Sequence, residues 1–259
     1  MSGVPTSFHL GPLDFHTYGL GLAIATYVAF LYAERRFRTR HLSLEHFGWF
    51  TGWVIVAGLV GARLAHVATN WSIYQHDPAR AFALWQGGLA SFGGIALGLV
   101  VGLVLVRRWW PEVSMLTFSD ALVPALVAGW ALGRLLGPQF MYQGGGHLTH
   151  QWFGIHYAGQ VGKRVPVPLI QGSEDGLLWL VLVGLERRER SHRAGAITGV
   201  AMVIWGVVRT LDEHFLLGQN SKSGSVGVQI AGLVLSVAGV VILVRRQRHV
   251  APNHLVIED

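Results

Sequence analysis

Three arginines lie inside stretches of the sequence that are otherwise apolar: Arg63, Arg134 and Arg209. A guanidinium group keeps its charge at any physiological pH. At the middle of a membrane such a group costs at least about 2.5–3.5 kcal/mol on insertion scales. A single arginine is tolerated when its side chain extends to the membrane surface. Three such arginines indicate a common function, and the simplest is that they bind an anion within the membrane protein.

Two acidic residues follow Arg209 at helical spacing. Asp212 comes three residues after Arg209 and Glu213 comes four residues after it, so both lie on its side of a helix. One interpretation is an internal ion pair that neutralises Arg209 within the membrane. The other is that Glu213 orients Arg209 toward a phosphate group of a ligand.

A glycine-rich segment, residues 85–94, leads into an apolar stretch and contains Gly93 and Gly94. Glycine lets the backbone approach a ligand closely and permits positive φ. Small residues also allow transmembrane helices to pack tightly against each other. Both interpretations of this segment stay open at the level of sequence.

Histidines gather in the longest polar segment, residues 138–167, which contains His147, His150 and His156. Histidine is a natural base near neutral pH. No carboxylate or cysteine accompanies these histidines in the segment, so a metal site is not favoured. We expect the protein to use no metal and no other cofactor.

The elements that must position these residues are membrane-spanning helices. Hydrophobic residues make up 51% of the 259-residue chain and charged residues only 13%, whereas soluble domains carry roughly 25% charged residues. A helix needs about 20 residues to cross the hydrocarbon core. Seven apolar segments of about this length predict an all-α polytopic membrane protein, and they are approximately 15–33, 47–69, 88–106, 115–137, 168–185, 195–217 and 226–244.

The basic residues predict how these segments are oriented. Alternate loops contain thirteen of the twenty lysines and arginines, and the opposite loops contain four. The thirteen belong in the cytoplasm by the positive-inside rule, so we expect the N-terminus outside and the C-terminus inside. The three intramembrane arginines then share a depth just below the outer surface. The thirteen are Arg35, Arg36, Arg38, Arg40, Arg107, Arg108, Arg187, Arg188, Arg190, Arg193, Arg245, Arg246 and Arg248.

The chain is expected to form one transmembrane domain over residues 1–259. Residues 138–167 form an extracytoplasmic loop in this arrangement, and residues 249–259 form a disordered cytoplasmic tail. No removable signal peptide is expected at the N-terminus. The absence of cysteine excludes disulfides and catalysis by a thiolate of the protein itself. The basic residues form short clusters beside the spans, which favours contact with anionic lipid over binding of nucleic acid.

Several motifs in order resemble the prolipoprotein diacylglyceryl transferases of bacterial membranes. The resemblance extends from Gly11 to about Arg246, and no single motif carries it. The similar segments are Gly11-Pro12 with His16-Thr17-Tyr18-Gly19-Leu20, Gly61-Ala62-Arg63, residues 85–94, Gly133-Arg134-Leu135, Asp175-Gly176, and Gly206 through Arg209 with Glu213.

The resemblance implies a reaction at the plasma (inner) membrane of a bacterium. A diacylglyceryl group would move from phosphatidylglycerol to the lipobox cysteine in the signal peptide of a preprolipoprotein, and glycerol phosphate would leave. Arg134 and Arg209 would contact the phosphate, with Glu213 in support. The lipid site would be lined by Tyr18, Arg63, Gly93 and Gly94.

Some positions depart from the family's pattern. Phe92 stands where the family usually has a histidine, Gly137-Pro138 follows the arginine signature in place of a polar residue, and Gln171 replaces a carboxylate. The proton of the substrate thiol then needs another acceptor, and His16 or His147 could serve.

Three functions therefore remain open. The first is diacylglyceryl transfer. The second is a catalytically impaired relative that binds anionic phospholipid or a lipidated partner in the outer leaflet. The third is a small transporter with a central anion site, although the sequence shows no matched pair of broken helices.

Overall fold

The computed structural model describes residues 6–10, 13–82, 88–137, 140, 143–188, 194–215 and 222–248. The chain is mostly helical and divides into two compact units. The first unit comprises Met1–Arg36 and Leu116–Asp259, and the second comprises Phe37–Met115.

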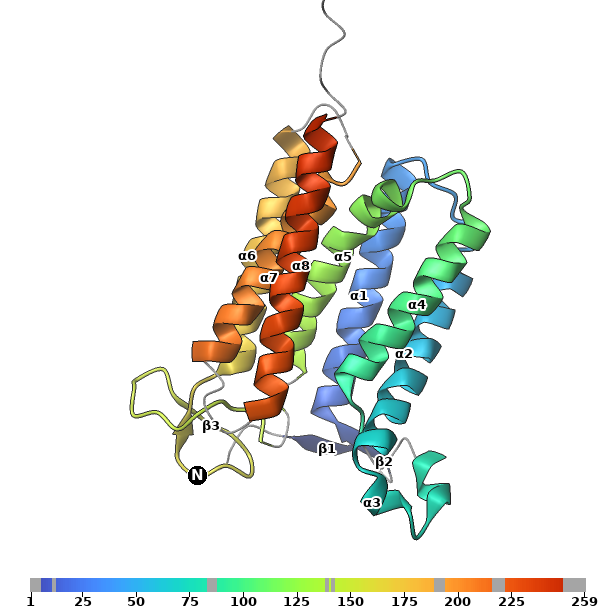
Figure 1. Cartoon of the computed structure of the whole chain (residues 1–259). Helices are drawn as coiled ribbons and strands as arrows, with labels where there is room; N and C mark the ends of the chain where they lie inside the picture. Colours follow the sequence, from blue (N-terminus) through green and yellow to red (C-terminus); the bar gives the residue numbers. More distant parts are fainter. Residues whose placement is uncertain are drawn as a thin grey trace, which may run out of the picture. The chain divides into compact units, whose positions relative to one another are not determined.

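The first unit is built from long helices and two small hairpins (Figure 1). Helices α6, α7 and α8 lie side by side, and buried apolar residues of α5, α6 and α7 form a core around Val127, Leu182 and Ile197. The elements are β1 (Ser7–Leu10), β2 (Leu13–His16), α1 (Thr17–Thr39), α5 (Met115–Leu136), β3 (Ile155–His156), β4 (Lys163–Arg164), α6 (Val167–Arg188), α7 (Ala196–Phe215) and α8 (Lys222–Arg248).

Helices α1 and α5 approach each other closely through small residues. A Cβ atom added at Gly21 of α1 would lie 1.8 Å from the carbonyl oxygen of Leu136, and one at Gly129 of α5 would lie 2.6 Å from Cβ of Ala29. Real Cβ atoms do not approach other atoms this closely, so glycine is required at both positions. This contact places the start of α1 beside the end of α5.

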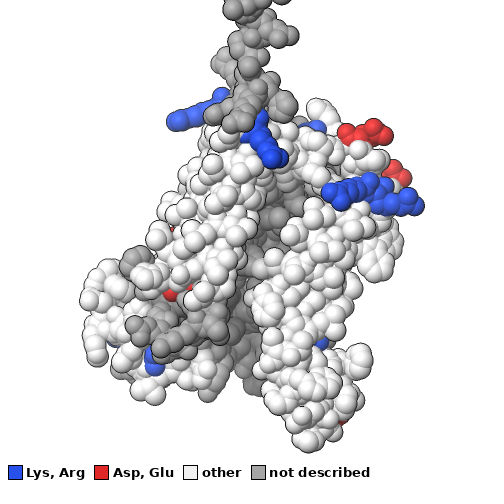
Figure 2. Space-filling view, in the orientation of Figure 1, with Lys and Arg blue, Asp and Glu red and all other residues white. Residues whose placement is uncertain are grey.

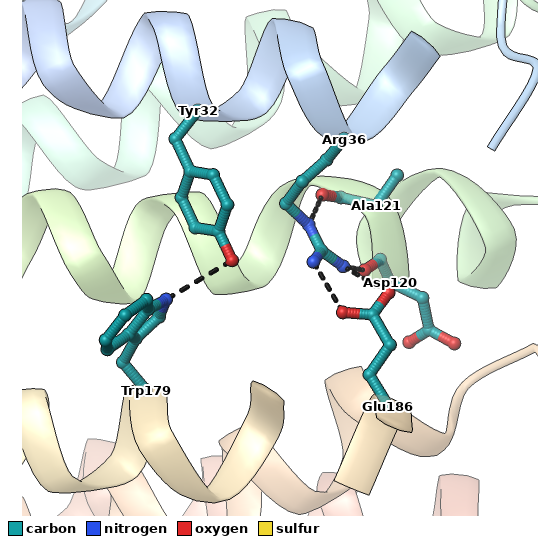
Figure 3. A network of polar contacts seen from close by, with 6 residues as sticks. All are labelled: Tyr32, Arg36, Asp120, Ala121, Trp179 and Glu186. Atoms are coloured by element: carbon teal, nitrogen blue, oxygen red, sulfur yellow. Dashed lines mark hydrogen bonds and ion pairs between the residues drawn. The ribbon is translucent and has the colours of Figure 1, made fainter. Parts of the chain in front are cut away.

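A polar network joins α1, α5 and α6 at the other end of these helices (Figure 3). Pro124 lies inside α5 and has no N–H group, so the carbonyl of Asp120 loses its usual helical donor. The buried Arg36 of α1 replaces that donor, because its Nη2 donates to the Asp120 carbonyl at 3.0 Å and its Nε to the Ala121 carbonyl at 2.7 Å. Its Nη1 pairs with Glu186 of α6 at 2.6 Å.

The side chain of Asp120 extends this network to α7. Its carboxylate accepts hydrogen bonds from the backbone N–H groups of Gly195 at 2.7 Å and Thr198 at 2.8 Å. Gly195 immediately precedes α7 and Thr198 lies in its first turn, where N–H donors have no partner within the helix. Asp120 therefore fixes where α7 begins.

The second unit contains α2 (Phe47–Thr69), α3 (Trp71–Tyr74), the 3-10 helix η1 (Pro78–Phe82) and α4 (Ser91–Trp109). Helix α2 lies along α4 (Figure 1), and glycines bring their backbones together. A Cβ atom at Gly61 would lie 2.4 Å from the carbonyl oxygen of Gly93, and one at Gly94 would lie 2.8 Å from that of Gly58. Close helix packing explains these four glycines.

The expectation of a helical membrane protein is confirmed. Within the described part of the chain, four helices are long and apolar enough to cross a membrane: α2, α4, α5 and the part of α8 from Val226 to Arg245. Each of the seven predicted segments overlaps one long helix. The number of spans and their orientation stay predictions.

The outer surfaces of the helices suit contact with lipid. On the face drawn in Figure 2, the middle parts of α4 and α8 show no acidic or basic side chains, and basic side chains gather near helix ends. Exposed apolar side chains cover these stretches, including Leu99 and Val104 of α4 and Val234 and Val237 of α8. Arg107 and Arg108 lie in the last turn of α4.

The segment predicted as an outer loop is partly ordered. Strands β3 and β4 pair in an antiparallel hairpin, and the N–H of Val165 donates to the carbonyl of His147 at 3.0 Å. The strands were not predicted by the sequence, because two to four residues are too few to show a β period. The predicted tail, residues 249–259, lies outside the described residues, as do Gly11, Pro12, Pro138 and residues 83–87.

Candidate functional site

Five charged residues converge in the first unit, where α5 and α7 end and α6 begins. We call them the polar cluster: Arg134 of α5, Glu174 and Asp175 of α6, and Arg209 and Asp212 of α7. The two arginines predicted to act together do lie within electrostatic range of each other. Helix packing, rather than sequence proximity, brings these charges together.

Arg209 lies at the centre of the polar cluster and is only 5% exposed. Its Nη2 lies 3.1 Å from Asp175 and 3.8 Å from Glu174, and its Nη1 lies 3.0 Å from Asp212. Within the described residues it forms no ion pair with Glu213, which is half-buried. The interpretation of an internal ion pair is thus supported, with Asp212 as the partner on α7. The predicted role of Glu213 stays a prediction.

Arg134 differs from Arg209 in its surroundings. It is half-buried, and within the described residues it has no ion pair or side-chain hydrogen bond. Its charge interacts at longer range with Asp175, Asp212 and Tyr18, and Tyr18 lies in the first turn of α1. A guanidinium group with free donors is suited to bidentate contact with a phosphate. Arg134 is therefore the cation of the cluster that can receive an anion.

Two tryptophans support the two arginines. The guanidinium carbon of Arg134 lies 5.6 Å from the ring centre of Trp130, and that of Arg209 lies 5.5 Å from the ring centre of Trp205. The two indole rings pack edge to face, with 6.2 Å between their centres. Each tryptophan precedes its arginine by one helical turn, so both cations rest on one aromatic pair. The same four-residue spacing from tryptophan to arginine is visible in the sequence of both helices.

The start of α6 approaches α5 through Gly172. A Cβ atom at this position would lie 2.8 Å from Cγ of Leu135. The close contact brings the start of α6 toward the end of α5, where Asp175 comes within electrostatic range of Arg134. Gln171 lies one turn earlier, is 4% exposed, and its amide oxygen has no hydrogen-bond partner among the described residues. The polar cluster thus has an unsatisfied acceptor on the face of α6 that contributes its acids.

Arg63 belongs to the second unit, and its buried guanidinium holds a loop. It donates to the carbonyls of Arg80 at 2.6 Å, Ala81 at 2.7 Å and Gly88 at 2.9 Å. It also lies 5.3 Å from the ring centre of Tyr74. Gly88 has φ of +76°, a conformation that favours glycine. These contacts explain a buried arginine without a ligand, and its predicted lipid contact stays a prediction.

The remaining predicted residues lie on both units. Gly93 and Gly94 pack against α2, as described above, and Phe92 is 61% exposed in the first turn of α4. His16 is exposed at the end of β2, immediately before α1, and His147 lies beside the β3–β4 hairpin. Among the described residues, no group of three or more histidine, cysteine, aspartate or glutamate side chains could hold a metal ion.

The fold and the polar cluster define a class of protein: a helical membrane protein with an arginine–carboxylate site at one end of its helices. Within that class, the chain belongs to the prolipoprotein diacylglyceryl transferase family, because the family model of that description matches residues 5–245. The resemblance inferred from the sequence motifs is confirmed.

Two named relatives match almost the whole length of the chain, and a third matches about two thirds of it. A phosphatidylglycerol–prolipoprotein diacylglyceryl transferase of Lactobacillus johnsonii is 28% identical, with 96% of this chain and 92% of the relative covered. One of Lactobacillus acidophilus is 27% identical over the same shares. One of Mycobacteroides abscessus is 32% identical over 68% of this chain and 56% of the relative.

Proposed function

We propose that the protein transfers a diacylglyceryl group from phosphatidylglycerol to the cysteine thiol of a prolipoprotein. The observation that carries this proposal is Arg134, a half-buried guanidinium with no ion pair among the described residues, beside the ion-paired Arg209. Family membership and the names of the relatives support the substrates. The lipobox cysteine is proposed as the acceptor.

The reaction breaks the bond between a glycerol carbon and a phosphate oxygen while sulfur bonds to that carbon. Negative charge builds on the departing glycerol phosphate. A preorganised cation stabilises such charge more than it stabilises the starting ester. Arg134 supplies this cation, and Arg209 stays oriented by Asp175 and Asp212 and adds its charge nearby.

The remaining assignments follow the same proposal. Tyr18 lines the lipid site beside Arg134. Glu213 supports Arg209 at the end of α7. In the second unit, the phospholipid is contacted by Arg63, Gly93 and Gly94. Seven helices cross the plasma membrane, with the N-terminus outside and the site near the outer leaflet. Phosphatidylglycerol would then reach Arg134 from the surrounding lipid.

Complementation tests this function in cells depleted of their own diacylglyceryl transferase. A reporter lipoprotein should shift on a gel when the protein is expressed. A reporter whose lipobox cysteine is replaced by serine is the matched control and should not shift. An unchanged reporter, with the protein expressed and inserted, would contradict the proposal.

A second function keeps support from particular positions. Phe92 and Gln171 replace groups that the family usually carries, which favours a relative that binds anionic lipid without transferring it. Such a protein would retain phosphatidylglycerol through purification and release no glycerol phosphate. The reporter gel shift in cells, together with measurement of retained lipid and released glycerol phosphate from purified protein, thus distinguishes the two functions.

A further inference from the structure

The polar cluster contains more acid than the arginines need. Glu174, Asp175 and Asp212 surround Arg209, with Arg134 as the second cation in range. Three carboxylates facing two guanidinium groups leave one negative charge in excess. A proton accepted by one carboxyl group would balance the cluster, since a like charge nearby favours the neutral form of an acid.

Glu174 is the one acid of these three whose side chain is partly exposed on the protein surface. The side chain of Glu174 is 32% exposed, whereas those of Asp175 and Asp212 are 2% and 5% exposed. Asp175 and Asp212 also make the shorter contacts with Arg209. Glu174 therefore lies near Arg209 but makes a longer contact with it, at 3.8 Å, than the two aspartates do.

Unsatisfied buried atoms point to a bound group at the same place. Arg209 Nε and the amide oxygen of Gln171 are buried and have no hydrogen-bond partner among the described residues. Arg209 and Gln171 are both more than nine-tenths buried. Buried polar atoms are normally paired, so a cluster of unpaired ones is typical of a site that a substrate completes.

We propose that Glu174 is the proton acceptor for the substrate thiol, and this inference rests on the proposed function. The proposed reaction releases the proton of the substrate thiol, so that proton needs an acceptor close to the polar cluster. Glu174 lies on α6 within the cluster that contains Arg134, whereas no described contact joins His16 to that cluster. A partly exposed carboxylate that lies 3.8 Å from the buried Arg209 is suited to general base catalysis.

The proton and the bonds balance in this step. The thiol gives its proton to the Glu174 carboxylate, and the sulfur forms a bond to the glycerol carbon. The carbon–oxygen bond to the phosphate breaks, and its electron pair leaves with glycerol phosphate. Glu174 then passes the proton to that phosphate and returns to its ionised form.

The test compares the full-length protein with Glu174→Gln in micelles that contain phosphatidylglycerol and a lipobox peptide. At pH 7 the rate of thioether formation should fall at least about 100-fold, the usual worth of a general base. Retention of phosphatidylglycerol should stay within about twofold. The matched control is Glu45→Gln, the same change at a carboxylate that is 78% exposed in the second unit, and it should leave both quantities unchanged.

The pH profile separates catalysis from structure. The pKa of a free thiol is about 8.5, so the rate of Glu174→Gln should rise about tenfold from pH 6.5 to 7.5 and about fiftyfold from pH 6.5 to 8.5. The wild-type rate should rise much less over this range. Glu174→Asp should restore part of the rate at pH 7.

Three outcomes would overturn the inference, and they are distinguishable. If Glu174→Gln matches the wild-type rate and pH profile, transfer stands and the base lies elsewhere. If the variant loses lipid retention together with activity and gains nothing at high pH, Glu174 has a structural role. If the wild type itself forms no thioether, the proposed function fails and this inference falls with it.

Discussion

At the scale of single residues, the two arginines of the polar cluster have different surroundings and should respond differently to substitution. Arg134 has no ion pair among the described residues, whereas Arg209 is buried against two carboxylates. Arg134→Gln should lower the rate of transfer by about 100-fold or more, because one preorganised donor to a developing oxyanion is worth that much. Its melting temperature should change little, and initial rates with thermal melts in detergent check both expectations.

Arg209→Gln should act first on stability. Removing one partner of a buried ion pair leaves the others uncompensated and costs about 3–5 kcal/mol. The double variant Arg209→Gln with Asp175→Asn should recover part of that loss, because it also removes one of the carboxylates left without a partner. Denaturant unfolding in micelles measures both, and a single variant as stable as the wild type would contradict the ion-pair geometry.

Only part of this site could be predicted from the sequence. Arg134 and Arg209 stand out because a charge inside an apolar run needs a reason. The acidic partners from α6 were not assigned, since Glu174 and Asp175 meet Arg209 only after α6 and α7 pack together. Glu213 was favoured over Asp212 because spacing alone does not show which carboxylate faces the guanidinium.

At the scale of helices, the apolar segments predicted the boundaries of some helices closely and those of others less well. The segment 47–69 coincides with α2 (Phe47–Thr69), whereas 15–33 is shorter than α1 (Thr17–Thr39). Helix α1 continues through charged residues because Arg36 is held by Asp120, Ala121 and Glu186 (Figure 3). Hydrophobic pattern alone does not reveal such a tertiary contact.

The Arg36 network gives a prediction at this scale. Arg36→Ala should destabilise the fold by about 3–5 kcal/mol, since it removes a buried charge partner and the donors that replace the one missing at Pro124. Arg36→Lys should recover only part, because a lysine does not reproduce the planar array of donors. Unfolding in micelles measures the loss, and equal stability of Arg36→Ala would contradict the network.

The contact between α1 and α5 gives a second prediction. Gly21→Ala would place Cβ 1.8 Å from the Leu136 carbonyl, so the helices must separate. Overpacking of this kind costs about 1–3 kcal/mol, and we expect the upper part of that range. Gly184→Ala in α6 is the control, because nothing lies within 4 Å of its Cβ position. Melting temperatures of the two variants should differ clearly, and equal values would contradict the close approach.

At the scale of the whole molecule, the arrangement in the membrane is open to direct measurement. The chain has no cysteine, so single cysteines report on one position each. Gln151→Cys in the loop before α6 should react with an impermeant maleimide in intact cells. Glu112→Cys, between α4 and α5, should react only after the membrane is opened. The reverse pattern would contradict the proposed orientation.

The most direct test of the central claim is the mass of a lipobox peptide after incubation with the purified protein and phosphatidylglycerol. We predict that the peptide gains one diacylglyceryl group on its cysteine, that one glycerol phosphate is released for each peptide modified, and that Arg134→Gln slows both by about 100-fold or more. An unmodified peptide, from folded wild-type protein that retains phosphatidylglycerol, would contradict transfer and identify the protein as a lipid-binding member of its family.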